Sequence, residues 1–563
     1  MAITRRSFFS GAALGTAGAA LACLAGCVPA ASASKDLSDT GETTVAEKYS
    51  WKMPPEPITD IVEAKDFDVV IIGAGVSGTS AAEAASREGA KVAVLEQSGS
   101  FTGLGMDCAH IGSKWQKEHG IEIDPDDASR LIYKWSQSTA NRQLINTWAT
   151  RSGEVFDYLI DIAEESGLVI ANGLGATTKL DWGDNEETWR IYNTPISFVN
   201  PEDGMFGRTK EGNTANYNLV KLFVERATDK GAEFFYNTRA LQLVQNGSGA
   251  ITGVIAQSDG GYVQYNAAKG VILACGDFAG NKEMVDAWCP IMNRADAVVY
   301  PVENGNMGDG IKMGLWAGAA LSRTEPAPMI HPVDEDFVLS PFYMAWMTVN
   351  VRGERYAPEM PYEPYITNAR MVQPNNIGWN IFDADYATWV EKQWPEKYEY
   401  FLNEGSTYSP GKCADILAER VESGSIVSSD TLEGLAQSLG IPANTFVATV
   451  KRYNELCEEG KDVDFGVMAR YMTPLKTPPF YANRVPAFGV VIPFGLHVDN
   501  NSQVCTDADE PIPGLFAIGN MQGDFLAYTY PVICPGLSVG RGLTYGQLVG
   551  AALAHGTVLT EEM

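Results

Sequence analysis

Residues 66–96 read DFDVVIIGAGVSGTSAAEAASREGAKVAVLE, and this stretch decides the fold of the chain. A run of β-branched residues over Val69–Ile72 predicts a buried strand, and a helical pattern follows the glycines. Gly73 suits a tight turn, Gly75 lets the backbone approach a pyrophosphate, and Gly78 lets helix and strand pack closely. The segment therefore predicts a dinucleotide site, with the pyrophosphate at the positive end of the helix.

A second predicted strand completes this unit. Lys91–Leu95 is apolar, and it delivers Glu96 to the position where an acid hydrogen-bonds an adenosine ribose. A glycine motif alone is a weak signal, because loops produce it by chance. Strand, helix, second strand and terminal acid in register are far more specific. The alternative is a parallel α/β unit whose glycine turn binds no nucleotide.

The N-terminus has the features of an export signal. Thr4–Phe9 reads TRRSFF, a twin-arginine signal, and an Ala/Gly/Leu-rich segment follows it. LAGC, which ends at Cys27, resembles a lipoprotein cleavage box, whereas ASA at Ala31–Ala33 resembles an ordinary signal-peptidase site. We favour a lipid on Cys27, because small-residue stretches often match A-x-A; an uncleaved anchor is the third interpretation. The sequence thus predicts twin-arginine export of a folded protein to an extracytoplasmic location.

Composition excludes several classes of partner. The chain has 70 acidic and 41 basic residues and a net charge of −29, so nucleic acid is not an expected partner. Its nine cysteines form no C-x-x-C or C-x-x-C-H motif, and no two histidines have metal-ligand spacing. We therefore predict no iron–sulfur cluster, c-type haem or metal site.

Changes in amino-acid composition divide the chain into segments. Residues 1–33 are the predicted signal peptide, and 34–65 read as a polar, then Pro-rich linker or arm. A Gly-rich α/β pattern over 66–328 returns over 481–563, whereas 329–480 is rich in Trp, Tyr and Pro. We predict an α/β fold in which a doubly wound Rossmann-type domain is built from two segments, with a second domain inserted between them.

Several blocks resemble the fumarate reductase/succinate dehydrogenase flavoprotein family, in its soluble, exported bacterial branch. The blocks are the glycine motif with Glu96, GVILACGDFAGNKEM at 270–284, GDGIKMGLWAGA at 308–319, VNVRGERYAPE at 349–359 and IPGLFAIGN at 512–520. Together they are more specific than any single motif. The resemblance implies FAD as the cofactor, held by the Rossmann-type domain, and an α+β cap domain that closes over the flavin.

The resemblance also implies an FAD site. The first three glycines would approach the pyrophosphate and Glu96 would bind the ribose. The other implied contacts are Gly103 near the flavin, Ala240 at the adenine, Gly276 near the pyrophosphate, Asp309 and Asn520 on the ribityl side, and Gly536, Leu537 and Ser538 at the start of the last helix. The positive end of that helix would stabilise reduced flavin at its N1–O2 edge. Leu104 stands about where relatives with covalent FAD have a histidine, so we expect non-covalent FAD.

The implied reaction is hydride transfer from flavin N5 to an activated C=C bond, with a proton delivered to the neighbouring carbon. Fumarate reductases anchor two carboxylates with arginines, but here Glu363 and Ile533 fall at about those positions. The family's histidine is also missing from VVIPFGLHVD at 490–499. We therefore expect fumarate to be a poor substrate. The expected substrate is a larger α,β-unsaturated carbonyl compound, an enoate, enone or steroid-like molecule, with Glu363 beside it.

Aromatic residues take the place of the missing anchors. Tyr528, Tyr530 and Pro531 resemble the 3-ketosteroid dehydrogenase branch, in which a tyrosine hydroxyl and a backbone N–H polarise a ring ketone. Tyr530 is the candidate for this electrophilic role, and Tyr528 is a candidate substrate contact. The alternative is that Tyr530 lines the flavin pocket without reacting.

Three more residues are catalytic candidates. His331 matches a family position near the substrate, and its alternative role is that of a hydrogen-bonded core histidine. Arg370 and Arg541 are candidate proton donors or anchors, although arginines often bind backbone carbonyls instead. We expect Arg355 and Glu359 to fix the cap on the flavin domain rather than to touch the substrate.

The electrons are expected to come from outside the chain, because it has no haem or cluster signature. A membrane cytochrome or quinol oxidoreductase would be the donor, in anaerobic respiration, and a lipid on Cys27 would hold the enzyme beside it. Other functions stay open: 3-ketosteroid dehydrogenase-type oxidation, true fumarate reduction, an FAD-dependent oxidase, and an electron-transfer flavoprotein without a substrate pocket.

Overall fold

The computed structural model describes residues 49–172, 191–202, 214–298, 305–332, 344–359, 365–393 and 410–559. The chain divides into two compact units, Met1–Met53 and Pro54–Met563. In the first unit only η1 (Ser50–Lys52) and its flanking residues are described. The predicted signal peptide, Cys27 and Glu363 lie outside the described ranges. Across these ranges, no helix combines the length and the apolar character of a membrane span.

A mainly parallel sheet is built around the first glycine motif. β1 (Ile61–Ile72) pairs in parallel with β2 (Val92–Leu95) on one side and with β9 (Gly261–Leu273) on the other. Val69–Ile72 are all buried, which explains their unbroken apolar pattern, since parallel sheets are covered on both faces. In spatial order the strands are β17 (Gln503–Cys505), β18 (Pro511–Ala517), β9, β1, β2 and β6 (Glu233–Phe235). β7 (Arg239–Gln245) and β8 (Ile251–Ser258) extend β9 in antiparallel fashion.

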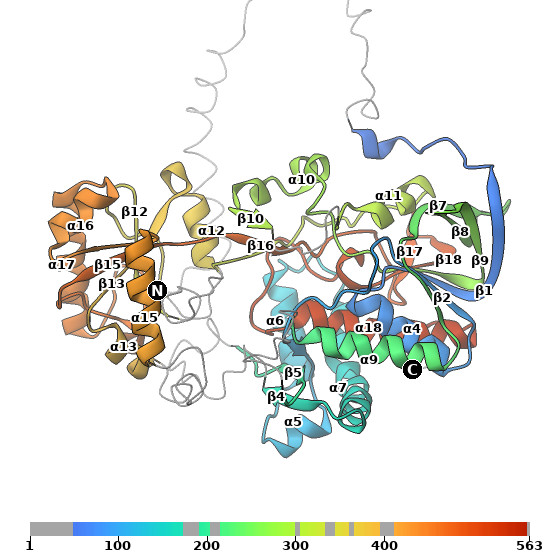
Figure 1. Ribbon diagram of the computed structural model, residues 1–563, viewed down its shortest axis with the longest axis horizontal. Coiled ribbons are helices and arrows are strands. Elements are labelled where there is room, and N and C mark those ends of the chain that lie inside the picture. Colours follow the sequence, from blue (N-terminus) through green and yellow to red (C-terminus); the bar gives the residue numbers. More distant parts are fainter. Residues whose placement is uncertain are drawn as a thin grey trace, which may run out of the picture. The chain divides into compact units, whose positions relative to one another are not determined.

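Three helices from distant parts of the chain pack together beside this sheet (Figure 1). α4 (Val76–Arg87) contacts both α18 (Leu537–His555) and α9 (Asn216–Asp229). The first two approach closely because small residues line their contact: a Cβ at Gly550 would lie 2.4 Å from the Ala81 carbonyl oxygen. The parallel βαβ unit and its helices confirm the predicted α/β class, a doubly wound Rossmann-type domain assembled from two segments of the chain.

The chain between residues 114 and 165 is mainly helical. α6 (Pro125–Trp135) begins with Asp124 as its N-cap and a proline in the first turn, a favoured start for a helix. α7 (Arg142–Glu165) begins after Asn141, whose side chain accepts a hydrogen bond from the Gln143 N–H. α6 packs on α7, which also contacts α5 (Lys114–Glu118). A small antiparallel sheet contains β3 (Cys108–Ala109), β5 (Pro195–Val199) and β4 (Val169–Asn172).

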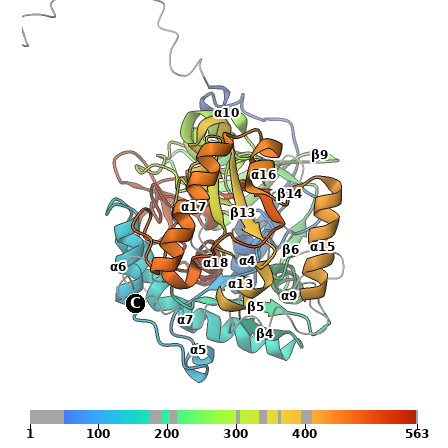
Figure 2. The same cartoon turned by 90° about the vertical axis from the view of Figure 1, so that its left-hand side faces the viewer.

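The inserted segment folds around its own antiparallel sheet (Figure 2). Its strands, in spatial order, are β12 (Met347–Asn350), β13 (Gly378–Asp383), β15 (Phe480–Arg484) and β14 (Ile426–Ser429). One apolar face of this sheet packs on α16 (Leu432–Leu439) and α17 (Ala443–Glu459). Other helices in the described part of this segment are α12 (Tyr365–Met371), α13 (Tyr386–Gln393) and α15 (Pro410–Ser423). This α+β unit is the predicted cap domain.

A further short sheet contains strands from both sides of the insertion, in the order β10 (Ala297–Val298), β16 (Phe488–Val491) and β11 (Met329–His331). β11 thus lies outside the cap sheet, although residue 329 is the predicted start of the cap. The cap sheet in turn passes the predicted boundary at 480, because Arg484 still pairs with Trp379. β1 begins at Ile61, inside the predicted linker, because its first residues pair with β9. α11 (Asp309–Trp316) ends shortly before Gly318, which turns with φ of +93°.

Candidate active site

The three motif glycines form a cradle at the start of α4. Gly73 has φ of +106°, and a Cβ there would lie 2.5 Å from the Ala274 carbonyl oxygen. A Cβ at Gly78 would lie 2.0 Å from the Gly73 carbonyl oxygen, so neither position accepts a side chain. At Gly75 the nearest atom to a Cβ is 3.9 Å away, so the space above the helix N-terminus is open. This arrangement fits a pyrophosphate group approaching the backbone.

Glu96 lies beside this cradle at the end of β2. Its carboxylate accepts hydrogen bonds from the backbone N–H groups of Ala74 (2.9 Å) and Ser98 (2.8 Å). Its carbonyl oxygen accepts from the Thr238 N–H at 2.8 Å, two residues before Ala240. The sheet therefore brings the glycine turn, the acid and the predicted adenine contact to one edge.

Asp309, predicted on the ribityl side, lies against two cations at the start of α11. Arg239 Nη2 is 2.7 Å from its carboxylate, and Lys312 forms a second ion pair with it. Burial opposes the charge, but the bond from Lys312 and the charge of Arg239 outweigh it and lower the pKa of Asp309. Since Arg239 directly precedes Ala240, this acid lies near the predicted adenine contact. Gly276, with φ of +76°, packs against the Asn306 side chain.

The loop after Glu96 meets the N-terminus of α18. Gly103 packs so closely on α9 that a Cβ would lie 2.5 Å from the Tyr217 Cα atom. Gly536, with φ of +81°, is the N-cap of α18, and its carbonyl oxygen accepts a hydrogen bond from the Ala109 N–H at 3.1 Å. The two segments predicted to hold the flavin ring are thus adjacent, and the loop after Glu96, which includes Leu104, contains no histidine.

A buried polar cluster lies at this helix terminus. The Tyr530 hydroxyl oxygen accepts a hydrogen bond from the Ser538 N–H at 2.9 Å. The Ser538 hydroxyl donates to Asn520 Oδ1 at 2.6 Å, and Arg541 Nη2 donates to the Gly519 carbonyl oxygen at 2.8 Å. Tyr530 is only 4% exposed, and burial raises its pKa to about 12, so the hydroxyl keeps its proton at neutral pH. The fold therefore joins four residues that the sequence nominated separately.

The segment that carries Tyr530 is braced by residues that the sequence did not reveal. The Tyr365 hydroxyl, on α12, donates to the Tyr530 carbonyl oxygen at 3.0 Å, and its ring stacks on Trp135. The Tyr192 N–H donates to the Ile533 carbonyl oxygen at 2.7 Å. These contacts join segments far apart in the chain, and no local pattern indicates them.

A family model described as "FAD binding domain" matches residues 68–531. The chain belongs to this family. It is an FAD-dependent oxidoreductase of the fumarate reductase/succinate dehydrogenase flavoprotein group, which acts on CH–CH or C=C bonds. The loop with Leu104 agrees with non-covalent FAD.

Proteins of known activity resemble this flavoprotein over most of its length. The vinyl phenol reductase of Lactiplantibacillus plantarum is 26% identical over 515 residues, which cover 87% of this chain and 97% of that protein. The urocanate reductase of Eggerthella lenta is 25% identical over 542 residues, covering 92% and 80%. The crystal structure of 3-ketosteroid-Δ4-(5α)-dehydrogenase from Rhodococcus jostii RHA1 with 4-androstene-3,17-dione has a TM-score of 0.68 at 25% identity, covering 89% and 100%.

Tyr528 and His331 occupy different environments in the flavoprotein. Tyr528 is 40% exposed and adopts φ of +64°, a strained conformation for a bulky residue, while its N–H donates to the Glu325 carbonyl oxygen. Tyr528 therefore lies partly exposed at the surface, whereas Tyr530, two residues further along the same segment, is buried. His331 is buried in β11, opposite Phe488, and burial lowers its pKa to about 3. The imidazole is thus neutral at physiological pH, so it supplies no positive charge to the site.

Arg370 is fully buried on α12 and pairs with Asp296 at 3.2 Å. Asp296 also pairs with Arg484 at 2.8 Å and accepts a hydrogen bond from the Ala487 N–H at 2.9 Å. Burial lowers the pKa of Arg370. The ion pair joins the cap helix to the loop before β10, and its catalytic role stays a prediction.

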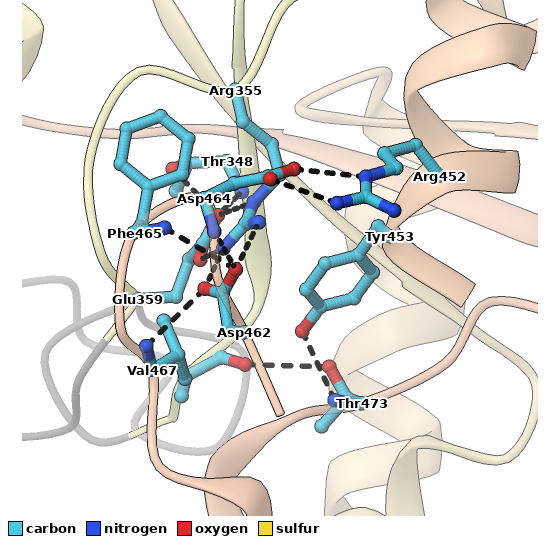
Figure 3. A network of polar contacts seen from close by, with 11 residues as sticks. Thr348, Arg355, Glu359, Arg452, Tyr453, Asp462, Asp464, Phe465, Val467 and Thr473 are labelled. Atoms are coloured by element: carbon cyan, nitrogen blue, oxygen red, sulfur yellow. Dashed lines mark hydrogen bonds and ion pairs between the residues drawn. The ribbon is translucent and has the colours of Figure 1, made fainter. Parts of the chain in front are cut away.

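Arg355 and Glu359 pair inside the cap (Figure 3). Arg355 Nη2 lies 2.5 Å from Glu359 and 2.9 Å from Asp462, and its guanidinium stacks between the rings of Tyr453 and Phe465. Burial works against the charge, but the two acids outweigh it and raise the pKa of Arg355. All these partners belong to the cap, so the expectation that the pair fixes the cap on the flavin domain is wrong. The reason is that the turn after β12 packs on α17, where the Thr449 hydroxyl donates to the Gly353 carbonyl oxygen at 2.7 Å.

Proposed function

We propose that this flavoprotein is an exported reductase that saturates the activated C=C bond of an α,β-unsaturated carbonyl compound in anaerobic respiration. The vinyl phenol and urocanate reductases, named for reduction of two different unsaturated molecules, support the direction. The steroid-bound dehydrogenase supports a ring ketone as the activating group. Bound FAD would supply the hydride.

The Tyr530 hydroxyl carries this proposal. Because its oxygen accepts a hydrogen bond from the Ser538 N–H, its own proton is free to be donated to another acceptor. Donation to a substrate carbonyl would stabilise the negative charge that develops there during reduction. The raised pKa keeps the hydroxyl protonated throughout the physiological range. Tyr365 holds the backbone of the same residue, which fixes the position of the donor.

The absence of a cation at one key position supports a substrate that is not a small dicarboxylate. Ile533, which stands about where the family's clamping arginine would be, is buried and apolar. A dicarboxylate would have to lose its hydration without a paired charge there, which is costly. An aryl or ring enone needs only apolar area and one hydrogen-bond donor at its carbonyl.

The experiment is anaerobic reoxidation of the reduced flavin by a panel of candidate acceptors. The purified holoprotein is reduced and mixed with aryl enones, cyclic enones, steroid enones, enoates and fumarate. We expect rapid reoxidation by at least one enone and slow reoxidation by fumarate. Fast fumarate reduction, or no reoxidation by any conjugated carbonyl compound, would contradict the proposal.

We also propose that the enzyme acts outside the cytoplasm and receives electrons from a membrane cytochrome or quinol oxidoreductase. The twin-arginine signal at Thr4–Phe9 supports export of a protein already loaded with its cofactor. The LAGC box supports a lipid on Cys27 that would hold the enzyme beside its donor.

A further inference from the structure

Arg541 is a buried cation without a charged partner. Its side chain, on the first turns of α18, is 1% exposed. Nη2 donates to the Gly519 carbonyl oxygen at 2.8 Å and lies 3.4 Å from Asn520 Oδ1. Nε and Nη1 are buried and have no hydrogen-bond partner. No carboxylate among the described residues forms an ion pair with this guanidinium.

The other buried arginines of the described chain differ in this respect. Arg355 has two carboxylate partners, and Arg370 has Asp296. Burying an unpaired charge costs several kcal/mol, and burial lowers the pKa of Arg541 to about 10, so it stays charged at neutral pH. The groups around it, the Gly519 carbonyl, the protonated Tyr530 and the Phe525 ring 4.9 Å from the guanidinium, carry no net charge and offset only part of that cost.

An uncompensated buried cation stabilises negative charge that forms nearby. In a medium of low dielectric constant, such a charge acts over several ångströms without direct contact. Arg541 belongs to the same hydrogen-bonded cluster as Asn520 and Ser538, which the sequence predicts on the ribityl side and at the N1–O2 edge of the flavin. The N-terminus of α18 adds a partial positive charge at the same place.

We propose that Arg541 raises the reduction potential of the bound FAD by stabilising the negative charge that the flavin gains on reduction. The two unpartnered nitrogens and the lack of a carboxylate partner among the described residues are the observations that support this role. The inference depends on FAD binding, which family membership shows, and not on the substrate proposed above. A wrong substrate assignment would therefore leave it standing.

The test is the midpoint potential of the FAD in purified holoprotein, measured by spectroelectrochemistry. Arg541→Met and Arg541→Gln remove the charge, and Arg541→Lys keeps it. At a fixed ambient potential, both neutral variants should show a ratio of reduced to oxidised flavin lowered about tenfold or more, which is about 30 mV for a two-electron couple. Arg541→Lys should have a midpoint potential close to that of the parent, because it keeps the charge. Arg452→Met, which removes a half-exposed arginine of the cap, is the charge-matched control and should leave the potential unchanged.

Three outcomes would overturn the inference. A parental potential in the neutral variants would do so, even if their thermal stability fell, because Arg541 would then be structural. A raised KM with an unchanged potential would assign it to substrate binding instead. If the midpoint potential fell as far in Arg541→Lys as in the neutral variants, the shape of the side chain rather than its charge would matter. If a neutral variant fails to hold FAD, the potential of Arg541→Lys is compared with that of the parent and of the other neutral variant.

Discussion

Two glycines of the first motif differ in what an added methyl group would meet. At Gly78 the methyl would overlap the Gly73 carbonyl oxygen, whereas at Gly75 it would enter open space above the N-terminus of α4. Gly75 also has a negative φ, so alanine fits its backbone. Gly78 is thus required by the fold, whereas we expect Gly75 to be required by the cofactor.

Alanine substitutions should separate these two requirements. Gly78→Ala should lower the free energy of unfolding of the apoprotein by about 1–3 kcal/mol, because the backbone must shift. Gly75→Ala should leave that stability unchanged and weaken FAD binding about tenfold or more, since the methyl occupies the path of the pyrophosphate. Urea denaturation of the apoproteins and FAD titration measure the two effects. Parental FAD affinity in Gly75→Ala would mean that the pyrophosphate lies elsewhere.

Individual site residues were predictable where a motif spans them. Asn520 ends one block of the family resemblance, and Tyr530 and Ser538 precede and open the last helix, so the sequence nominated each of them. Their hydrogen bonds to one another were not predictable, because they depend on how the segment before α18 folds back. Tyr365, which donates to the Tyr530 carbonyl oxygen, and Trp135, which stacks on Tyr365, were missed for the same reason, because they come from distant parts of the chain.

At the scale of elements, the cap depends on one buried ion-pair network. In Arg355→Met, the new side chain still packs between the two rings, but Glu359 and Asp462 are left without a cation. Breaking a buried pair in this way costs about 3–5 kcal/mol, so the cap should unfold at a lower denaturant concentration than in the parent. Arg452→Met, which breaks the exposed pair with Asp464, should change little. Equal denaturation midpoints for parent and Arg355→Met would show that the network adds no stability.

The segment leading to Tyr530 is held by a histidine between two carboxylates. His497 Nδ1 lies 2.6 Å from Asp524, and Nε2 lies 2.7 Å from Asp509. The bond to Asp524 is the main cause that raises the pKa of His497; burial and the charge of Arg323 oppose it. A raised folded-state pKa means that the stabilisation is complete below the unfolded value of about 6.5 and is lost as pH rises through the folded value.

The melting temperature should therefore fall as pH rises from about 6 to above the folded pKa of His497. In His497→Gln this fall should be smaller, because the titrating group is gone. Differential scanning calorimetry over that range measures it. An identical pH dependence in the variant would show that other groups control the transition.

At the scale of the whole molecule, a local sequence signal predicted the fold class, whereas strand pairing between distant segments determined where the domains begin and end. The strand–glycine–helix pattern around Gly75 and the spaced family blocks sufficed for the Rossmann-type domain and its insertion. The end of the cap sheet was not predictable, because Arg484 continues β15 only through its pairing with Trp379. Likewise, β1 starts at Ile61 because β9 lies beside it.

The proposed membrane attachment would affect the entire molecule, and one substitution tests it. If Cys27 carries a lipid, Cys27→Ser should move the enzyme from the membrane fraction to the soluble extracytoplasmic fraction while activity per molecule stays the same. Fractionation and immunoblotting measure the distribution. An unchanged distribution would favour cleavage after Ala33 or an uncleaved anchor.

The most direct test of the account is a single turnover of the reduced holoprotein with an enone that the parent reduces, compared between parent and Tyr530→Phe. The variant keeps the ring and loses only the hydroxyl that Ser538 orients. We predict that anaerobic flavin reoxidation slows about 10²-fold or more, while FAD content and the flavin spectrum stay parental. Reoxidation at nearly the parental rate, or brisk reoxidation of the parent by fumarate, would contradict the central claim.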